Sequence, residues 1–412
     1  MKRIAIIGGG ISGLTVLHYL KQRLGDDVQI TLFEREASTG GTICSFKKDS
    51  CLFEWGPNGF LDNQPASLQL IDELGLTDQL IEAQAASSCR YIQVKGNLYS
   101  VSLNPLVFIQ TPLLLLKDKW SLIAGIFKRN ISTDQSIYHY VSQRFSANIA
   151  EILVDPFISG IYAGDIKRLH MVSAFPKFRR KAFKKLRMLS FKGGMGQLIE
   201  ALDKRYAKHI QTDSEISSAK TGADITIVAT SAYAAAKIVE NINPVISRIL
   251  AQIPYAPVAV AGLLFKADSF KKKPKGFGYL IPSKAGKDIL GVLIESNIYA
   301  GRALEGQIMM RVMLGGAHHP AIINDQQEQI IAKAVKEIDS VYGLVSKPLE
   351  VFVKIWPKAI PQYEIDYPRW RQSIAEQSAK TPGLYLCANY LDGVSFNDCV
   401  YNSKALARAV NL

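Results

Sequence analysis

The segment Arg3-Ile4-Ala5-Ile6-Ile7-Gly8-Gly9-Gly10-Ile11-Ser12-Gly13 joins a short apolar run to a glycine-rich turn that fits the pattern GxGxxG. A helical pattern of apolar residues follows up to Leu24, and a second apolar run, residues 28–33, ends at Glu34. In such a strand–turn–helix–strand unit, the first glycine permits the bend, the second lets the backbone approach a pyrophosphate, and the third lets the helix pack closely against the strand. We therefore predict a dinucleotide site, with phosphates at the helix N-terminus and a ribose hydroxyl on Glu34.

Features further along the chain indicate which dinucleotide is bound. The pair Gly40-Gly41 follows Glu34 by six residues, and flavoproteins of the glutathione-reductase-like and amine-oxidase-like groups carry such a pair. Residues 382–390 predict one more strand, and residues 393–399 lead into a terminal helical segment that would reach the ring end of a flavin. No second GxGxxG follows another strand. We predict FAD rather than NAD, with oxygen or a quinone as the electron acceptor.

The composition is that of a soluble globular protein, because 48% of the 412 residues are apolar and 21% are charged. A disordered chain, a collagen-like fibre and a small disulfide scaffold are thereby excluded. The five cysteines are scattered, with neither a CxxC pair nor a zinc-like Cys/His spacing. We therefore predict reduced thiols, a cytoplasmic location and no metal.

The N-terminal region and one apolar run raise the question of a membrane. The apolar run at residues 4–7 is too short for a secretory signal. The uncharged run 96–116 is long enough to span a bilayer, but it contains Pro105 and Pro112 together with six polar side chains, so we reject a spanning helix. Residues 113–129 mix apolar side chains with basic ones, and this amphipathic segment either lies on a membrane surface or faces a core.

Positive charge is concentrated in one part of the chain. The net charge is +13, and residues 165–192 alone hold ten basic residues and one acidic residue. Within that stretch, residues 177–188 interleave basic side chains with Phe178, Phe183, Leu186 and Met188, as in a basic helix on an anionic lipid surface. RNA binding and a solvated basic face are the alternatives, although no nucleic-acid module signature is found.

Several motifs together resemble one family. The segment Phe53-Glu54-Trp55-Gly56-Pro57-Asn58-Gly59-Phe60 is similar to the E-x-GPN segment of protoporphyrinogen oxidases, which belong to the amine-oxidase-like flavoproteins. Further stretches match that family in order along nearly the whole chain: residues 159–165, 191–195, 276–282, 360–363 and 393–399. Departures occur at Ala388 and at Asn402-Ser403, where the family usually has glycine and Ser-Gly, and both bear on FAD contacts.

The resemblance implies an activity and partners. Such enzymes remove six electrons from protoporphyrinogen IX to give protoporphyrin IX in haem biosynthesis, in three rounds of hydride transfer to FAD, each reset by oxygen with release of hydrogen peroxide. The alternatives are oxidation of coproporphyrinogen III, an inactive FAD-containing tetrapyrrole carrier and, more distantly, an amine or carotenoid oxidoreductase. The expected partners are a porphyrinogen and molecular oxygen, with a homodimer and a peripheral position on the cytoplasmic face of an anionic membrane as further candidates, and no nucleic acid.

The resemblance also assigns roles to single residues. Arg90 would pair with a propionate carboxylate, and the alternative is an ordinary surface arginine. The side chains that would sandwich the tetrapyrrole are Phe277, Leu280 and Met313, and the alternative is that they are ordinary core residues. Asn58 is the predicted catalytic residue, holding the substrate near the flavin, although it could simply be a turn residue after Pro57. The predicted FAD contacts are Gly8, Gly10, Ile11, Ser12, Gly13, Glu34, Arg35, Gly40, Gly41, Gly56, Pro57, Asn58, Val394 and Ser395.

The expected fold is a mixed α/β protein with a Rossmann-like FAD-binding domain, a mixed-sheet substrate domain and a helical membrane-associating lobe. The FAD-binding domain is discontinuous and comprises residues 1–91, 189–231 and 381–412, with a buried strand at 224–230. The helical lobe covers residues 92–188. The substrate domain covers residues 232–380, mostly as antiparallel sheet with a helix near 327–342.

Overall fold

The glycine-rich turn follows the central strand of a parallel sheet in this computed structural model, which describes residues 1–48, 51–101, 111–128, 131–174 and 186–411. The sheet has the order β10-β2-β1-β11-β17, so the chain returns to it from distant parts of the sequence. All neighbouring strands are parallel. The strands are β1 (Lys2–Ile7), β2 (Val28–Phe33), β10 (Ile210–Gln211), β11 (Ile225–Val228) and β17 (Leu384–Leu386). The strands predicted at 3–7, 28–33, 224–230 and 382–390 are thereby confirmed, with shorter bounds for the last two.

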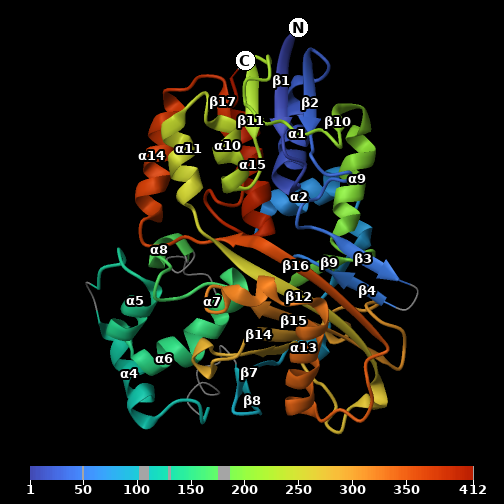
Figure 1. Ribbon diagram of the computed structural model, residues 1–412, viewed down its shortest axis with the longest axis vertical. Helices are drawn as coiled ribbons and strands as arrows, with labels where there is room; N and C mark the ends of the chain where they lie inside the picture. Colours follow the sequence, from blue (N-terminus) through green and yellow to red (C-terminus); the bar gives the residue numbers. More distant parts are fainter. Residues whose placement is uncertain (49–50, 102–110, 129–130, 175–185, 412) are drawn as a thin grey trace.

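Helices cover both faces of this sheet, as the upper lobe in Figure 1 shows. Ile4 and Ile6 of β1 share a core with the helices on one face: α1 (Ile11–Leu24), α9 (Gly196–Tyr206) and α15 (Phe396–Ala409). Val228 of β11 packs with the helices on the other face: α10 (Ala232–Val239), α11 (Pro244–Gln252) and α14 (Tyr367–Ala379). Apolar residues on both sides of the strands explain why their sequences are continuously apolar rather than alternating.

A second sheet of seven strands forms the lower lobe, with the order β16-β12-β15-β14-β13-β7-β8. Its strands are antiparallel except for β13 and β7, which run parallel. The strands are β7 (Arg90–Val94), β8 (Asn97–Val101), β12 (Tyr255–Lys266), β13 (Gly278–Leu280), β14 (Ile289–Ile294), β15 (Gln307–Gly315) and β16 (Glu350–Pro361). Helix α13 (Gln327–Tyr342), predicted from the sequence, packs on one face of this sheet.

The structure differs from two expected boundaries. Residues 232–380 are the expected substrate domain, but α10, α11 and α14 within this range pack on the parallel sheet.

The second difference lies in the first strands of the seven-stranded sheet. Residues 92–101 were expected in the helical lobe, but they form most of the hairpin β7–β8. Lys95 and Gly96, at the turn, both have positive φ angles, of 50° and 81°, which matches the tight turn that joins twisted antiparallel strands. The uncharged run 96–116 therefore starts as a strand, and its residues 102–110 lie outside the described part of the chain.

Helices also form the lobe at the lower left of Figure 1. They are α4 (Leu116–Phe127), α5 (Ile137–Arg144), α6 (Ala147–Ile149), α7 (Asp155–Tyr162) and α8 (Met171–Ala174). Within the described ranges, no helix is both long and apolar enough to cross a bilayer. Most of the basic helix predicted at 177–188, namely residues 177–185, lies outside the described residues. At its end, Arg187 pairs with Asp62 (Nε–Oδ2 2.8 Å) and Met188 begins a strand, so these two residues belong to the folded body.

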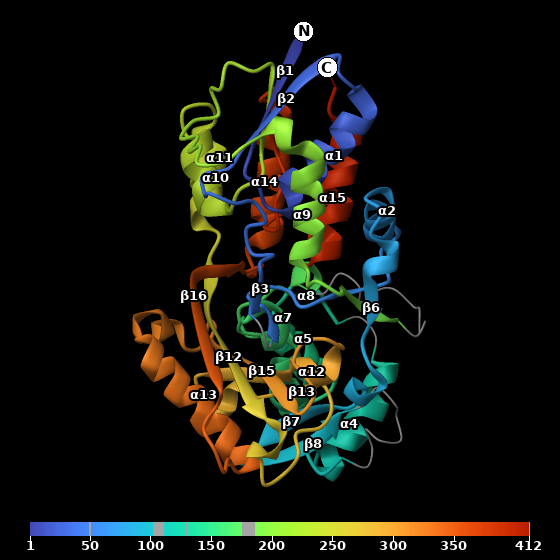
Figure 2. The same cartoon turned by 90° about the vertical axis from the view of Figure 1, so that its right-hand side faces the viewer.

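Two small sheets and two short helices join the lobes, and Figure 2 shows this junction from the side. One sheet pairs β3 (Ser45–Lys48) with β4 (Cys51–Glu54), and the other has the order β5-β9-β6. The remaining elements are β5 (Phe60–Leu61), β6 (Leu80–Glu82), β9 (Met188–Phe191), α2 (Pro65–Glu73) and α12 (Glu295–Ile298). The segment between β4 and β5 carries the Gly-Pro-Asn motif, so that motif lies where the lobes meet.

Candidate functional site

The turn after β1 lies against the end of β2 and the second glycine pair. The Gly9 amide donates a hydrogen bond to Glu34 Oε2 (2.6 Å), and the Gly40 amide donates to the Gly9 carbonyl (2.8 Å). Gly10 and Gly40 also form an isolated parallel bridge. Three segments that are separate in the sequence therefore meet at one edge of the parallel sheet, where dinucleotides bind in such folds.

Two glycines of the turn differ in what surrounds them. A methyl group on Gly13 would collide with the Gly8 carbonyl oxygen, so Gly13 is required for packing of α1 on β1. At Gly10, the corresponding position has no described atom within 4 Å, and the backbone angles of φ −70° and ψ 175° suit any residue. Packing within the protein therefore does not require glycine at position 10, and the open space beside it fits a ligand that approaches the backbone.

The N-terminus of α1 is suited to phosphate. Gly10 is its first flanking residue, and no side chain in the described part of the chain caps it. Ile11, Ser12 and Gly13 form the first turn, whose backbone N–H groups lack partners inside the helix. Uncapped N–H groups and the helix dipole together attract an anion. The open space at Gly10, these amides and the Glu34 carboxylate thus fit the pyrophosphate and ribose of a dinucleotide.

A second helix N-terminus reaches the same region. Helix α15 begins after Gly393, Val394 and Ser395, and the Ser395 hydroxyl accepts a hydrogen bond from the Asp398 amide. Phe396, in its first turn, contacts the ring of Phe60 at 5.0 Å between centroids. The segment after the Gly-Pro-Asn motif is thereby joined to the start of α15.

Buried tyrosines hold the loop that leads into α15. The Tyr363 hydroxyl donates to the Asn389 carbonyl (2.6 Å) and accepts from the Gly393 amide (2.9 Å). Its ring stacks on Tyr367 at 4.0 Å between centroids, and the Tyr367 hydroxyl donates to the Tyr390 carbonyl (3.0 Å). Burial raises the pKa of Tyr363 well above its ordinary value, so this hydroxyl stays protonated and can bond at both ends.

The departures from the family pattern strengthen this loop. The Asn402 amide donates to the carbonyls of Leu391 (3.3 Å) and Asp392 (3.2 Å). Ser403 is fully buried, and its hydroxyl lies 3.3 Å from Cys387 Sγ. These side chains turn inward and bond to the protein, so their geometry does not oppose a ligand at the N-terminus of α15.

The Gly-Pro-Asn segment is fixed between the lobes. A methyl group on Gly56 would collide with the Thr42 carbonyl oxygen, which places this segment against the second glycine pair. From the other side, Arg311 of β15 donates to the carbonyls of Gly56 (2.6 Å) and Glu54 (3.0 Å). Asn58 is buried, and its Nδ2 has no hydrogen-bond partner among the residues described. An unpartnered buried amide is costly, so Asn58 fits a role in contacting a ligand.

A buried cluster of four charges stands behind this segment. Arg302 Nη1 lies 3.4 Å from Glu54 Oε1, and Arg311 Nε lies 3.2 Å from Glu295 Oε1; all four side chains are almost inaccessible to solvent. Burial raises the pKa of Glu54 to about 7, while Arg302, the Ser45 hydroxyl and the Met195 amide favour its charged form. The cluster has no net charge when all four groups are ionised, and losing one member would leave a buried charge unpaired.

The residues expected to contact the substrate lie on the seven-stranded sheet. Leu280, Gly291 and Met313 occupy one register row across β13, β14 and β15. Met313 and Phe277 pack on the same small cluster around Tyr299, and Gly59, next to Asn58, lies against the Tyr299 hydroxyl. Phe277, Leu280 and Met313 are each partly exposed rather than core residues. The sheet therefore presents an apolar surface close to the Gly-Pro-Asn segment.

Arg90 is the charged residue on this surface. Its guanidinium stacks over the Phe277 ring at 4.8 Å, and the register pairs Arg90 with Gly278. The side chain is exposed and forms no ion pair or hydrogen bond with any described residue. Surrounding atoms nevertheless lower the pKa of Arg90 by desolvation. Such a guanidinium is free to grip a ligand carboxylate.

One predicted cofactor contact is placed differently. Arg35 follows Glu34, but its guanidinium pairs with Glu36 (2.6 Å) on the surface rather than facing the glycine-rich turn. The neighbouring carboxylate of Glu36 supplies a local partner for this guanidinium. The other predicted residues gather around the turn, the second glycine pair, the Gly-Pro-Asn segment and the start of α15.

Sequence reasoning missed the residues that hold the site in place. Arg311 and Glu295 carried no motif, and Glu54 and Tyr363 were part of quoted motifs without an assigned role. The one available signal was an arginine inside an otherwise apolar strand, at 311 in residues 308–315. A buried arginine in such a position needs a partner, which the sequence does not identify.

Comparisons with known proteins agree with this geometry. The family described as flavin containing amine oxidoreductase matches residues 11–411. The chain is 26% identical to a coproporphyrinogen III oxidase from Bacillus subtilis, covering 98% of this chain and 97% of the relative. It is 24% identical to a chloroplastic protoporphyrinogen oxidase from Nicotiana tabacum, covering 98% and 84%. A crystal structure of a protein assigned as a protoporphyrinogen oxidase, from Exiguobacterium sp. 255-15, has a TM-score of 0.85 at 21% identity, covering 99% and 98%.

The substitution Gly10→Ala tests the dinucleotide cradle. The added methyl group meets no described atom and no backbone strain, so the melting temperature of the FAD-free protein should change by no more than about 2 °C. It would occupy the space where the pyrophosphate approaches, so we expect affinity for FAD to fall at least tenfold, on the order of 1.4 kcal/mol. Thermal unfolding and FAD titration by flavin fluorescence measure both effects. Wild-type affinity in this variant would move the pyrophosphate away from Gly10.

Proposed function

Because this chain belongs to the flavin-containing amine oxidoreductase family and is an FAD-dependent oxidoreductase, we propose that it oxidises protoporphyrinogen IX to protoporphyrin IX. The observation that carries the proposal is the unpaired guanidinium of Arg90, stacked on Phe277 within an apolar surface next to the Gly-Pro-Asn segment. A large apolar macrocycle with carboxylate side chains is complementary to such a surface. The names of the relatives from Bacillus subtilis and Nicotiana tabacum point to the same substrate class.

The residues of the chain have distinct tasks in this reaction. FAD, held by the glycine-rich turn, Glu34 and the start of α15, supplies the hydride-accepting chemistry. Arg90 binds a propionate, and Phe277, Leu280 and Met313 keep water from the apolar ring. Asn58, buried at the junction of the lobes, holds the macrocycle near the flavin, with its side-chain amide carbonyl as the acceptor for a pyrrole N–H group. Arg311 fixes the segment that carries Asn58 and so acts as a positioning residue.

The overall reaction requires an electron acceptor as its second substrate, and we propose that this acceptor is molecular oxygen. The macrocycle loses six hydrogens in three two-electron steps, and three oxygen molecules are reduced to three hydrogen peroxide molecules. The chain carries no second GxGxxG turn, which supports oxygen rather than a nicotinamide as the acceptor. A quinone acceptor would give the same porphyrin without peroxide.

Coproporphyrinogen III is the second candidate substrate, and the relative from Bacillus subtilis favours it. It carries four propionates where protoporphyrinogen carries two, so it would need more cationic partners. Mechanism and fold would be unchanged.

A comparison of the two porphyrinogens tests the proposal. The FAD-loaded protein is mixed with each porphyrinogen separately, while porphyrin fluorescence and oxygen uptake are recorded. We expect protoporphyrinogen to have the higher kcat/KM, with one oxygen consumed and one peroxide formed per two electrons. A higher kcat/KM for coproporphyrinogen would transfer the proposal to that substrate. A flavin spectrum with neither porphyrin formed would refute porphyrinogen oxidation.

The variant Arg90→Ala tests the anchor. Loss of a charge-assisted pair that is the same in the bound substrate and in the transition state raises KM with little change in kcat. We expect KM for protoporphyrinogen to rise about tenfold or more, and kcat to stay within about twofold. The matched control is Arg369→Ala, because Arg369 is a surface arginine on α14 whose side chain is 89% exposed. Unchanged kinetics in Arg90→Ala would remove this residue from the substrate site.

We also propose that the helical lobe binds the surface of an anionic membrane. Helix α4 exposes Trp120 (71%) and Phe127 (77%) to solvent, together with Leu116, Ile123 and Ile126. Leu116, Trp120, Ile123 and Phe127 recur at helical spacing, and Lys117 is exposed among them. An apolar helix face flanked by lysines is typical of interfacial helices.

Vesicle flotation tests this surface. Wild-type protein should float with vesicles of phosphatidylcholine and phosphatidylglycerol, and less so at high salt. The double variant Trp120→Ser/Phe127→Ser should lose at least about four-fifths of the bound fraction, because both side chains would leave the lipid. The control Leu304→Ser/Leu349→Ser removes exposed apolar residues elsewhere and should bind normally. Equal losses in both variants would contradict a specific role for α4.

A further inference from the structure

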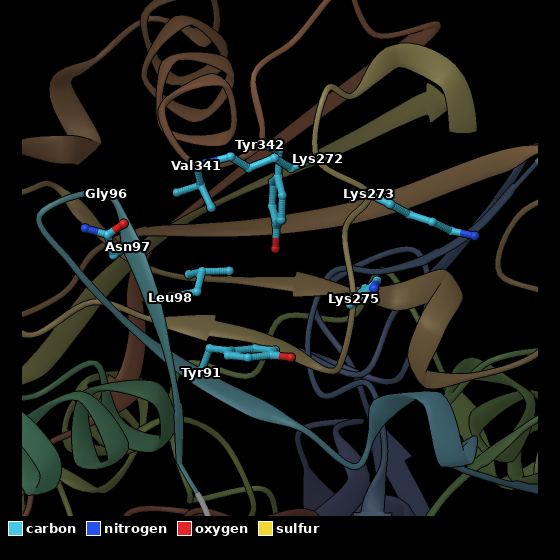
Figure 3. Close-up of a pocket in the computed structure, with 9 residues that line it drawn as sticks. All are labelled: Tyr91, Gly96, Asn97, Leu98, Lys272, Lys273, Lys275, Val341 and Tyr342. Atoms are coloured by element: carbon cyan, nitrogen blue, oxygen red, sulfur yellow. The ribbon is translucent and has the colours of Figure 1, made fainter. Parts of the chain in front are cut away.

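A cavity of about 230 Å³ opens on the far side of the seven-stranded sheet from the substrate surface. Figure 3 shows it between the hairpin β7–β8, the C-terminal end of α13 and the loop at residues 271–275. Tyr91, Leu98 and Tyr342 form an aromatic and aliphatic wall, and Lys272, Lys273 and Lys275 line the same cavity. None of these residues takes part in the proposed oxidation.

The lysine-rich loop is fixed in position by hydrogen bonds at both of its ends. The Lys271 amide donates to the Gly343 carbonyl (2.8 Å), and the Lys272 amide donates to the Tyr342 carbonyl (2.9 Å). At the other end, the Asn297 amide donates to the Gly276 carbonyl (3.2 Å). The cavity is thus formed in advance, so a ligand would not have to pay for ordering the loop.

The charges of the three lysines are not neutralised. Among the described residues, no acidic group pairs with Lys272, Lys273 or Lys275. Glu337, a buried acidic residue of α13, is already bound to Lys287 (Nζ–Oε2 2.6 Å). Three like charges around one cavity repel one another, and an anion between them would relieve that repulsion.

The wall of the cavity contains a polar atom without a partner. Tyr342 is 4% exposed, and its hydroxyl, which Figure 3 shows directed toward Leu98 and Lys275, forms no hydrogen bond within the described chain. Burial raises the pKa of Tyr342, so the hydroxyl remains a hydrogen-bond donor. A buried donor without an acceptor is unfavourable. The hydroxyl has almost no solvent-accessible surface of its own, so a small shift of the surrounding side chains would let a ligand oxygen or a water molecule satisfy this donor.

We propose that this cavity is a binding site for a small organic anion with one flat apolar ring, either a carboxylate or a phosphate ester. The ring packs on Tyr91 and Leu98, and the anionic group lies among Lys272, Lys273 and Lys275. The cavity is too small for a tetrapyrrole, so this ligand differs from the proposed substrate.

The site is separate from the substrate surface although it shares a strand with it. Arg90 and Tyr91 are consecutive residues of β7, and consecutive side chains of a strand point to opposite faces of a sheet. Tyr91 accordingly packs with the core beneath α13, while Arg90 stacks on Phe277 on the other side.

Calorimetric titration of the FAD-loaded protein with three probes tests the proposal. The probes are 2-naphthoate, 2-naphthyl phosphate and the uncharged 2-naphthamide. We expect at least one anion to bind with a dissociation constant in the micromolar range, and the amide to bind at least tenfold more weakly. Tighter binding of the phosphate ester than of the carboxylate identifies the phosphate class, and the reverse identifies the carboxylate class.

Three variants locate the binding. Lys272→Ala/Lys273→Ala/Lys275→Ala should weaken the anion at least tenfold. The matched variant Lys220→Ala/Lys237→Ala/Lys380→Ala also removes three positive charges, but from exposed lysines elsewhere in the chain. It should bind the anion like the wild type. Arg90→Ala should also bind normally. Three results would each overturn the proposal. They are a loss of anion binding in the matched variant equal to that in the pocket variant, a loss in Arg90→Ala alone, and no anion binding at millimolar concentration. None of these outcomes depends on porphyrinogen turnover.

Discussion

Arg311 makes the contact on which the relation between the two lobes depends. Its side chain extends from β15 of the seven-stranded sheet, donates to the carbonyls of Glu54 and Gly56, and pairs with the Glu295 carboxylate. The partner pair, Arg302 and Glu54, adds bonds to Ser190, Ser45 and Met195. Breaking such a buried pair typically costs about 3–5 kcal/mol, whereas a surface pair costs little. The distance between the cofactor cradle and the substrate surface is therefore set by charges that water cannot reach.

That cluster explains why a loop rather than a strand carries Asn58. Backbone carbonyls of a strand are occupied by neighbouring strands, but those of Glu54 and Gly56 are available to Arg311 because β4 ends there. Arg311 thus fixes a loop that carries a buried amide, Asn58 Nδ2, with no partner among the described residues. The tyrosine pair and Asn402 likewise hold the loop before α15.

Local patterns made most of the fold predictable, and long-range contacts limited the rest. The turn at 8–13, the apolar strands and the helix at 327–342 were recognised because spacing within a few residues specifies each of them. The hairpin at 90–101 was missed, because residues 92–101 were assigned to the helical lobe, and the pairing of β7 with β13 that places the hairpin in the second sheet joins residues far apart in the sequence. The bond between Arg311 and Gly56 joins residues 255 apart, and no local pattern encodes such a pairing. Motifs identified the candidate site residues, whereas only the structure identified the residues that support them.

The strand order of the parallel sheet has a consequence for synthesis. β1 and β2 leave the ribosome first, yet their sheet is completed by β17 and their helix α1 packs against α15, which both come from residues beyond 380. The edge of β1 is covered once β11 (residues 225–228) has been made, but the apolar face of α1 that packs on α15 stays uncovered until residues 396–409 have been made. About 370 residues separate the two helices, so this interval lasts roughly 20–70 s at 5–20 residues per second. During that interval the cradle lacks its second helix N-terminus, so the cofactor site is completed late.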